Sequence, residues 1–95
     1  MQRESNAATY RVPQPFEAVV RSLRRALAEA GMKVTGELNV AERIRQILSI
    51  GMSPCVILFA SAVDKTATWP SPLQIVVADR GQESEIHILR VLPAA

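Results

Sequence analysis

The segment CVILFA, residues 55–60, contains six apolar residues in succession and no polar position. Successive side chains of a strand point to opposite faces of a sheet, so a half-exposed strand alternates apolar and polar residues. This segment does not alternate, and we therefore expect an interior strand with both faces covered. The segment IVVA, residues 75–78, repeats the pattern and predicts a second strand of the same kind. The two segments place a sheet at the centre of the fold.

The region before this run has the pattern of a strand followed by a helix. Residues 8–12, ATYRV, alternate and predict a first strand that Pro13 closes. From Pro15 to Ala30, apolar residues recur at the three- and four-residue spacing of a helix, and Gly31 follows as a left-handed cap. The predicted buried stripe of this helix consists of Phe16, Val19, Val20, Leu23, Leu27 and Ala30.

A second strand and a second helix are predicted next. Residues 32–38, MKVTGEL, alternate again and indicate a half-buried strand. Its apolar face consists of Met32, Val34 and Leu38. Asn39 and Glu42 are spaced as in a helix capping box, and they predict a shorter helix that Gly51 terminates. The apolar face of this helix consists of Val40, Ile44, Ile47 and Leu48.

The remaining sequence predicts two more strands, at residues 73–78 and 85–92, joined by a polar turn that contains Gly81. The order of elements predicts an α+β, two-layer sandwich, in which two main helices cover one face of a five-stranded, mainly antiparallel sheet. Residues 1–7 are polar and without period, and we expect a flexible N-terminal tail there. Residues 8–95 then form a single domain.

The apolar strands create a conflict with the number of helices. Two helices cover one face of a sheet, whereas both faces of the segments at residues 55–60 and 75–78 are apolar. A monomer of this design would expose a large apolar patch, which soluble proteins rarely tolerate. We therefore expect another copy of the chain to cover the second face, in a two-fold homodimer.

The composition is that of a globular domain and argues against nucleic-acid binding, secretion and membrane insertion. The chain has 95 residues, 48% of them hydrophobic and 21% charged, with a formal net charge of +2. This is typical of a globular domain, and the excess positive charge is too small to indicate nucleic-acid binding. No apolar run is long enough for a signal peptide or a membrane span. A single cysteine forms no internal disulfide, so we expect a cytoplasmic protein with no membrane partner.

The segment PFEAVVRSLRRALAEAGMKV, followed by GELNV and CVILFASA, resembles the bacterial proteins grouped as domain of unknown function 302. The resemblance covers about residues 9–92 and implies a small α+β domain that is commonly dimeric. It implies no established activity and supplies no catalytic residues. The sequence departs from that family after the central strand, where an Asn-Pro pair is expected and SAVDK, residues 61–65, stands instead. No ligand site is therefore carried over to that position.

Two isolated side chains have chemistry that a site would use. Cys55 begins the apolar run, where a thiol is typically packed as a small hydrophobe and is unreactive. His87 is the single histidine, and Glu85 on the same strand face is placed to orient its ring. A lone histidine lacks the partners of a zinc site or of a Ser-His-Asp triad. We expect no catalytic residues, no metal and no cofactor, and favour packing for Cys55 and a structural role for His87.

The irregular segment at residues 61–72 is the most open region for a ligand. Asp64, Lys65 and Trp69 give it a carboxylate, an amine and a flat ring, which with His87 are the candidate ligand-binding residues. The favoured alternative is a short turn in which Trp69 packs over the core.

The arginines of the first predicted helix could form a basic patch, but glutamates at helical spacing offset their charge. Glu17, Arg21, Arg25 and Glu29 are spaced four apart, which predicts ion pairs along a solvated face. Aromatic residues for stacking on single strands are also few. We expect no nucleic-acid partner.

Two functions remain open. The first is a non-enzymatic binding or assembly domain that acts as a homodimer, and the second is a small-ligand sensor or small enzyme. The second would have a pocket between residues 61–72 and the sheet, near His87, with an unidentified small molecule as its ligand.

Overall fold

A computed structural model describes residues 7–64, 69 and 71–90 of the chain. In chain order, the elements are β1 (Ala7–Val12), α1 (Phe16–Glu29), β2 (Met32–Asn39), α2 (Val40–Leu48), β3 (Cys55–Ala62), β4 (Leu73–Asp79) and β5 (Ser84–Arg90). This is the predicted order. The last two residues predicted for β5, and residues 1–6 of the predicted tail, lie outside the described part, and Ala7 already belongs to β1.

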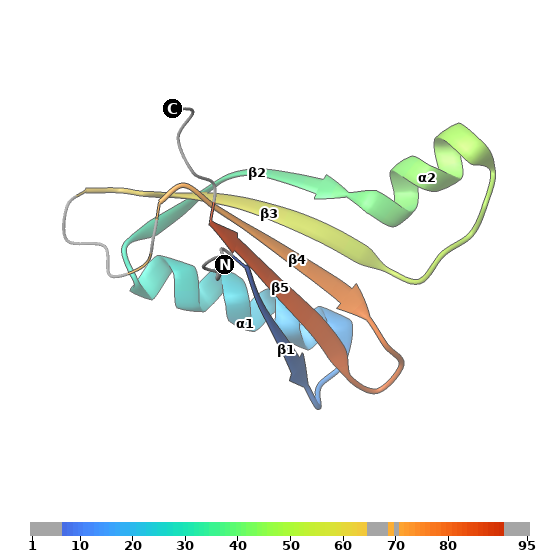
Figure 1. Ribbon diagram of the computed structural model, residues 1–95, viewed down its shortest axis with the longest axis horizontal. Helices are drawn as coiled ribbons and strands as arrows, with labels where there is room; N and C mark the ends of the chain where they lie inside the picture. Colours follow the sequence, from blue (N-terminus) through green and yellow to red (C-terminus); the bar gives the residue numbers. More distant parts are fainter. Residues whose placement is uncertain (1–6, 65–68, 70, 91–95) are drawn as a thin grey trace, which may run out of the picture.

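The five strands form one sheet in the order β1-β5-β4-β3-β2, and every neighbouring pair is antiparallel (Figure 1). The two apolar segments of the sequence form β3 and β4, which have a paired strand on each side. The protein is thus an α+β domain of two helices packed on a five-stranded antiparallel sheet, as predicted.

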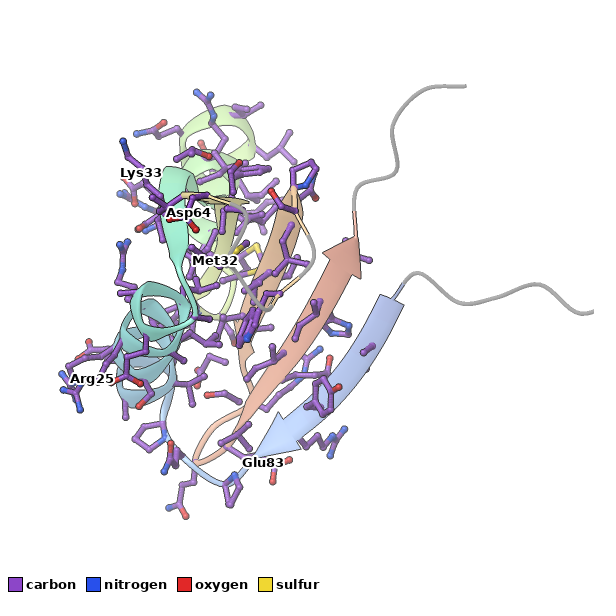
Figure 2. All side chains as sticks on the ribbon, turned by 90° about the vertical axis from the view of Figure 1, so that its left-hand side faces the viewer. Arg25, Met32, Lys33, Asp64 and Glu83 are labelled. Atoms are coloured by element: carbon purple, nitrogen blue, oxygen red, sulfur yellow. The ribbon has the colours of Figure 1, made fainter. Side chains whose placement is uncertain are left out.

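Helix α1 covers one face of the sheet with its predicted stripe. Val19 and Leu27 are buried, and the other four members pack against the same core. The sheet residues of that core are Met32, Val56, Leu58, Ala60, Leu73, Ile75, Val77 and Ile86. Figure 2 shows α1, with Arg25 on its outer side, lying along this one side of the sheet. The alternation of β3 and β4 is therefore fixed: the side chains of Leu58 and Ile75 point toward α1.

The face of the sheet that points away from α1 is called the open face below. Residues directly opposite each other in paired strands share a face, so the strand registers define its members. They are Thr9 and Arg11 on β1; Glu85, His87 and Leu89 on β5; Gln74, Val76 and Ala78 on β4; and Cys55, Ile57, Phe59 and Ser61 on β3. None of those on β3, β4 or β5 is fully buried, whereas most of their neighbours on the other face are.

Strand β2 departs from its predicted alternation. A β-bulge lies between Val34 and Gly36, so that Val34 pairs with Ala60 but Leu38 pairs with Ile57. An extra residue in one strand moves every later side chain to the opposite face. The prediction that Leu38 shares the face of Met32 and Val34 is therefore wrong. Leu38 lies on the open face with 37% of its surface exposed.

Helix α2 begins as predicted and ends earlier. The side chain of Asn39 accepts a hydrogen bond from the amide of Glu42 at 3.0 Å, which is the expected N-cap. The helix ends at Leu48, because Ser49 adopts the left-handed conformation with φ of 56°. The prediction that Gly51 terminates it is wrong, since the left-handed residue is the serine two positions earlier.

Helix α2 extends beyond the end of the sheet, in continuation of β2, rather than along a face as α1 does (Figure 1). It contacts β3, but none of its side chains is buried. The predicted apolar residues Ile47 and Leu48 are 67% and 55% exposed. Neither helix in the described part of the chain is long and apolar enough to cross a membrane.

The outer face of α1 lacks the ion pairs that the sequence predicted. Among the described residues, the ion pair of α1 joins Arg24 to Glu37 of β2, and the predicted pairs of Arg21 and Arg25 with glutamates four positions away do not form. Exposed pairs gain little energy in water, and holding two long side chains together costs entropy. The predicted pairs within α1 would therefore have added little to its stability.

Candidate functional site

The structure separates the residues that the sequence grouped into a ligand site. Trp69 is half-buried and packs against the core beneath α1. His87 lies on the open face, on the opposite side of the sheet. Asp64 is exposed just after β3, at the end of the sheet where Met32 begins β2 (Figure 2). Lys65 lies outside the described residues. The structure thus brings Trp69 together with the core and His87 together with a different set of partners.

The partners of His87 come from its own strand and from β1. Its Nε2 lies 2.8 Å from Oε1 of Glu85, and its Nδ1 lies 3.2 Å from Oγ1 of Thr9. A neutral imidazole satisfies both contacts when Nε2–H donates to the carboxylate and Nδ1 accepts from the threonine hydroxyl. The ring is held on both sides. The sequence indicated the contact with Glu85, but gave no signal for Thr9, because that contact depends on β1 lying beside β5.

Glu85 is the centre of an ion-paired cluster on β1, β5 and the turn before β5. Its carboxylate accepts a hydrogen bond from Nη2 of Arg80 at 3.1 Å, and Nε of Arg11 lies 3.7 Å away. The side chain of Glu85 is 14% exposed. Hydrogen bonds from His87 and then Arg80 lower the pKa of Glu85 below its ordinary value of 4.5. Arg11 also pairs with Glu83 at 3.1 Å, so the charges of this cluster are matched within it.

A hydroxyl, an imidazole and a carboxylate in hydrogen-bond contact form the arrangement on which hydrolase triads are based. Thr9, His87 and Glu85 have this connectivity. A triad also needs a substrate cleft with donors aimed at a developing oxyanion. Two clefts that described residues line both lie elsewhere. What the geometry supplies at His87 is a fixed ring and a set of paired charges at one border of the open face.

Apart from Lys33, which pairs with Ser61 near the start of β2, the described rest of the open face carries no charged side chain. Val76 lies between His87 and Ile57 across the strands, and Ile57 lies opposite Leu38. In the adjacent row, Ala78 separates Glu85 from Cys55. The apolar side chains of β3 and β4 therefore continue to the β2 edge without a charged residue between them. The bulge in β2 makes this surface larger than the sequence predicted, because it adds Leu38.

Cys55 lies at the start of β3 on the open face and is half-buried. Burial raises the pKa of its thiol above the ordinary value of 9.0, and the positive charge of Arg80 acts in the opposite direction. The thiolate is the nucleophilic form, so the environment opposes reactivity. A packing role for Cys55, as expected from the sequence, is consistent with this environment.

Described residues line two clefts, one at the start of α1 and one beside α2. The first has a volume of about 370 Å³, and its charged lining consists of Glu17, Arg21 and Asp79. The second, of about 250 Å³, lies between α2 and the segment that returns to β3, and includes Glu42, Arg45 and Met52. In the described part of the chain, no group of three histidine, cysteine, aspartate or glutamate residues is placed to hold a metal ion.

Comparisons with known proteins agree with this architecture. The family model described as "Domain of unknown function DUF302" matches residues 8–69. Among solved structures, the crystal structure of an uncharacterized conserved DUF302 protein from Bacillus stearothermophilus is similar, with a TM-score of 0.71 and 17% sequence identity. The match covers 90% of this chain and 74% of that one. A search of curated proteins found no match.

Proposed function

The chain belongs to the DUF302 family, and from this premise and the surface of its sheet we propose that it is a non-enzymatic cytoplasmic assembly domain that acts as a homodimer through the open face. The observation that carries the proposal is the uncharged centre of that face, where Ile57, Phe59 and Val76 are partly exposed and neither described helix lies over them. Apolar side chains that the fold itself leaves uncovered are typical of an interface.

The border of the open face also fits an interface between two copies. The ionised groups at β1 and β5 form pairs with one another, so a partner does not need to neutralise them. An apolar centre with a polar rim is the usual anatomy of a protein interface. A second copy supplies the same surface, which two-fold symmetry makes self-complementary. The single, partly buried cysteine suits a reducing compartment.

The proposal is tested by sedimentation velocity of the unmutated protein and of two face variants, Ile57→Asp and Val76→Asp. We expect the unmutated protein to be a dimer at micromolar concentration, and both variants to be monomers, because an unpaired carboxylate is costly to bury. Ser22→Asp, on the exposed outer side of α1, is the matched control and keeps the dimer. Leu58→Asp is not informative, since Leu58 is fully buried beneath α1 and its loss would unfold the domain.

The result that contradicts the proposal is an unmutated protein that sediments as a monomer at about 100 μM, far above the dissociation constant of a stable interface. Circular dichroism of each variant must match that of the unmutated protein, so that a monomer is not mistaken for an unfolded chain.

A second candidate function is small-ligand binding at Thr9, His87 and Glu85. The observation in its favour is the fixed orientation of the His87 ring between two polar partners. It is tested by a screen of small carboxylic acids and amines, monitored by the imidazole proton shifts of His87. A ligand that moves these shifts in the unmutated protein but not in Thr9→Val supports this function, and a screen without such a ligand argues against it.

A further inference from the structure

The α2 arm is defined here as helix α2 with the segment that follows it to Pro54. Its apolar surface has no partner among the described residues of the chain. None of the residues of α2 is buried. Four large apolar side chains of the arm are roughly half exposed or more: Ile47, Leu48, Ile50 and Met52. A helix of nine residues is too short to be stable on its own and normally depends on burial of its apolar side. The arm therefore lacks the packing that such a helix requires.

Two of the three charged residues of the arm lie away from its apolar side chains, whereas the third, Arg43, lies one turn before Ile47 on the same side of the helix. Glu42 and Arg45 form a bidentate ion pair with each other, on the other side of the helix from Ile44 and Ile47. From Gln46 to Val63, the sequence contains no charged residue. The tip of the arm, the return segment and β3 thus add no charged side chain of their own to the surface that they form. What covers it must also be apolar and uncharged.

The same chain has a second uncharged apolar surface, the centre of the open face, but the arm points away from it. The two ends of the arm are held side by side, because Asn39 is paired with Val56 where β2 and β3 meet. From there, the arm extends away from the sheet (Figure 1). The uncharged centre of the open face, around Ile57 and Val76, lies back toward the middle of the sheet. Two surfaces that match in their lack of charge are thus separated within one chain.

We propose that a second copy of the chain covers the arm: in the homodimer, the α2 arm of each protomer packs against the open face of its partner. This inference rests on the proposed function, and names the segment that completes the interface. A two-fold axis makes the contact reciprocal, so that each arm and each face are covered once. The contact brings Ile47 and Leu48 against the partner's apolar centre. The ion-paired cluster around Glu85 remains at the rim, where its charges stay hydrated.

The experiment compares arm variants with face variants by sedimentation velocity. Ile47→Asp and Leu48→Asp are expected to weaken dimerisation at least about tenfold, as Val76→Asp does. Gln46→Asp, on the same helix but beside the Glu42 side, is the matched control and changes the dissociation constant less than about twofold. Because Ile47 and Leu48 are exposed within their own chain, the arm variants retain the circular dichroism of the unmutated domain.

A cross-linking readout tests the contact directly. In a Cys55→Ser background, a tagged copy carrying Leu48→Cys is mixed with an untagged copy carrying Val76→Cys and treated with a short bismaleimide. The tagged product linked to the untagged copy is expected, whereas a tagged copy carrying Ser22→Cys gives none.

The outcomes separate the two proposals. Arm variants that remain dimers while Val76→Asp dissociates overturn the exchange of arms and leave the homodimer in place. Absence of the mixed cross-link in a dimer has the same meaning. An unmutated protein that is a monomer at about 100 μM overturns both proposals.

Discussion

The imidazole of His87 and the carboxylate of Glu85 lie two residues apart on one face of β5, with Nε2 2.8 Å from Oε1. This hydrogen bond holds the pKa of Glu85 below its ordinary value of 4.5, and the hydrogen bond from Arg80 makes the next largest contribution. A carboxyl group whose pKa is lowered by folding stabilises the folded state when it is ionised. This stabilisation is complete above the pKa that the Glu85 carboxyl group has in the unfolded chain. It is lost as the pH falls through the lower pKa that the group has in the folded protein.

The first prediction concerns acid stability. Between about pH 6 and pH 3, the free energy of unfolding should fall less steeply in Glu85→Gln than in the unmutated protein, because the variant has lost the titrating group. Urea denaturation at a series of pH values measures this slope. Glu29→Gln, an exposed position on α1, is the control and should leave the slope unchanged. Equal slopes for Glu85→Gln and the unmutated protein would show that the cluster does not hold the carboxylate as described.

The second prediction concerns Cys55. Because burial raises the pKa of its thiol, alkylation of the native protein at about pH 8 should be slower than alkylation of the urea-unfolded chain. Arg80 opposes this rise, so Arg80→Met should slow the native reaction further, while Arg80→Lys keeps the charge and the rate. Mass spectrometry of timed samples gives the rates. A native thiol that reacts as fast as the unfolded one would refute the packing role.

The third prediction concerns the N-cap of α2. Asn39→Ala removes the acceptor for the Glu42 amide and should destabilise α2 by about 1 kcal/mol. Since no side chain of α2 is buried, the effect should be local, and amide exchange in α2 should be roughly fivefold faster, with β4 unchanged. Asn39→Asp provides the same acceptor and serves as the control. Uniform acceleration across the sheet would contradict the local character of the helix.

The fourth prediction concerns Ser84, a buried polar residue at the start of β5. Its hydroxyl donates a hydrogen bond to the carbonyl of Gln14 at 2.9 Å, and so ties β5 to the connection between β1 and α1. Ser84→Ala leaves that carbonyl without its donor and should cost about 1 to 2 kcal/mol of unfolding free energy. Ser22→Ala, on the exposed side of α1, should change it by less than about 0.5 kcal/mol. Indistinguishable values in urea denaturation would rule out a stabilising role for this hydrogen bond.

The elements of this fold were predictable because each has a local period. The stripe that includes Val19 and Leu27 follows helical spacing. The segment at residues 55–60 lacks alternation because both faces of β3 carry apolar side chains, one face packing under α1 and the other forming part of the open face. The cap at Asn39 depends on a contact only three residues along the chain. These features can be predicted from the sequence because the residues that form each of them are close together in the chain.

The features that sequence did not predict depend on register and strand order. A bulge beside Gly36 decides the face of Leu38, and nothing in the alternation of MKVTGEL marks the extra residue. The contact between Thr9 and His87 joins the two ends of the chain, and exists because β1 is the neighbour of β5. The candidate site was therefore placed near Trp69, when the partners of His87 come from the opposite terminus.

The bulge in β2 limits how a strand of another chain can pair with the edge of this sheet. β2 is an edge strand, and the outer edge of a regular strand is a template on which another strand can add. Between Val34 and Gly36 the ladder is interrupted, so an incoming strand cannot keep its hydrogen bonds in step along the full length of β2. Open-ended growth into fibrils by strand addition at this edge is thereby obstructed.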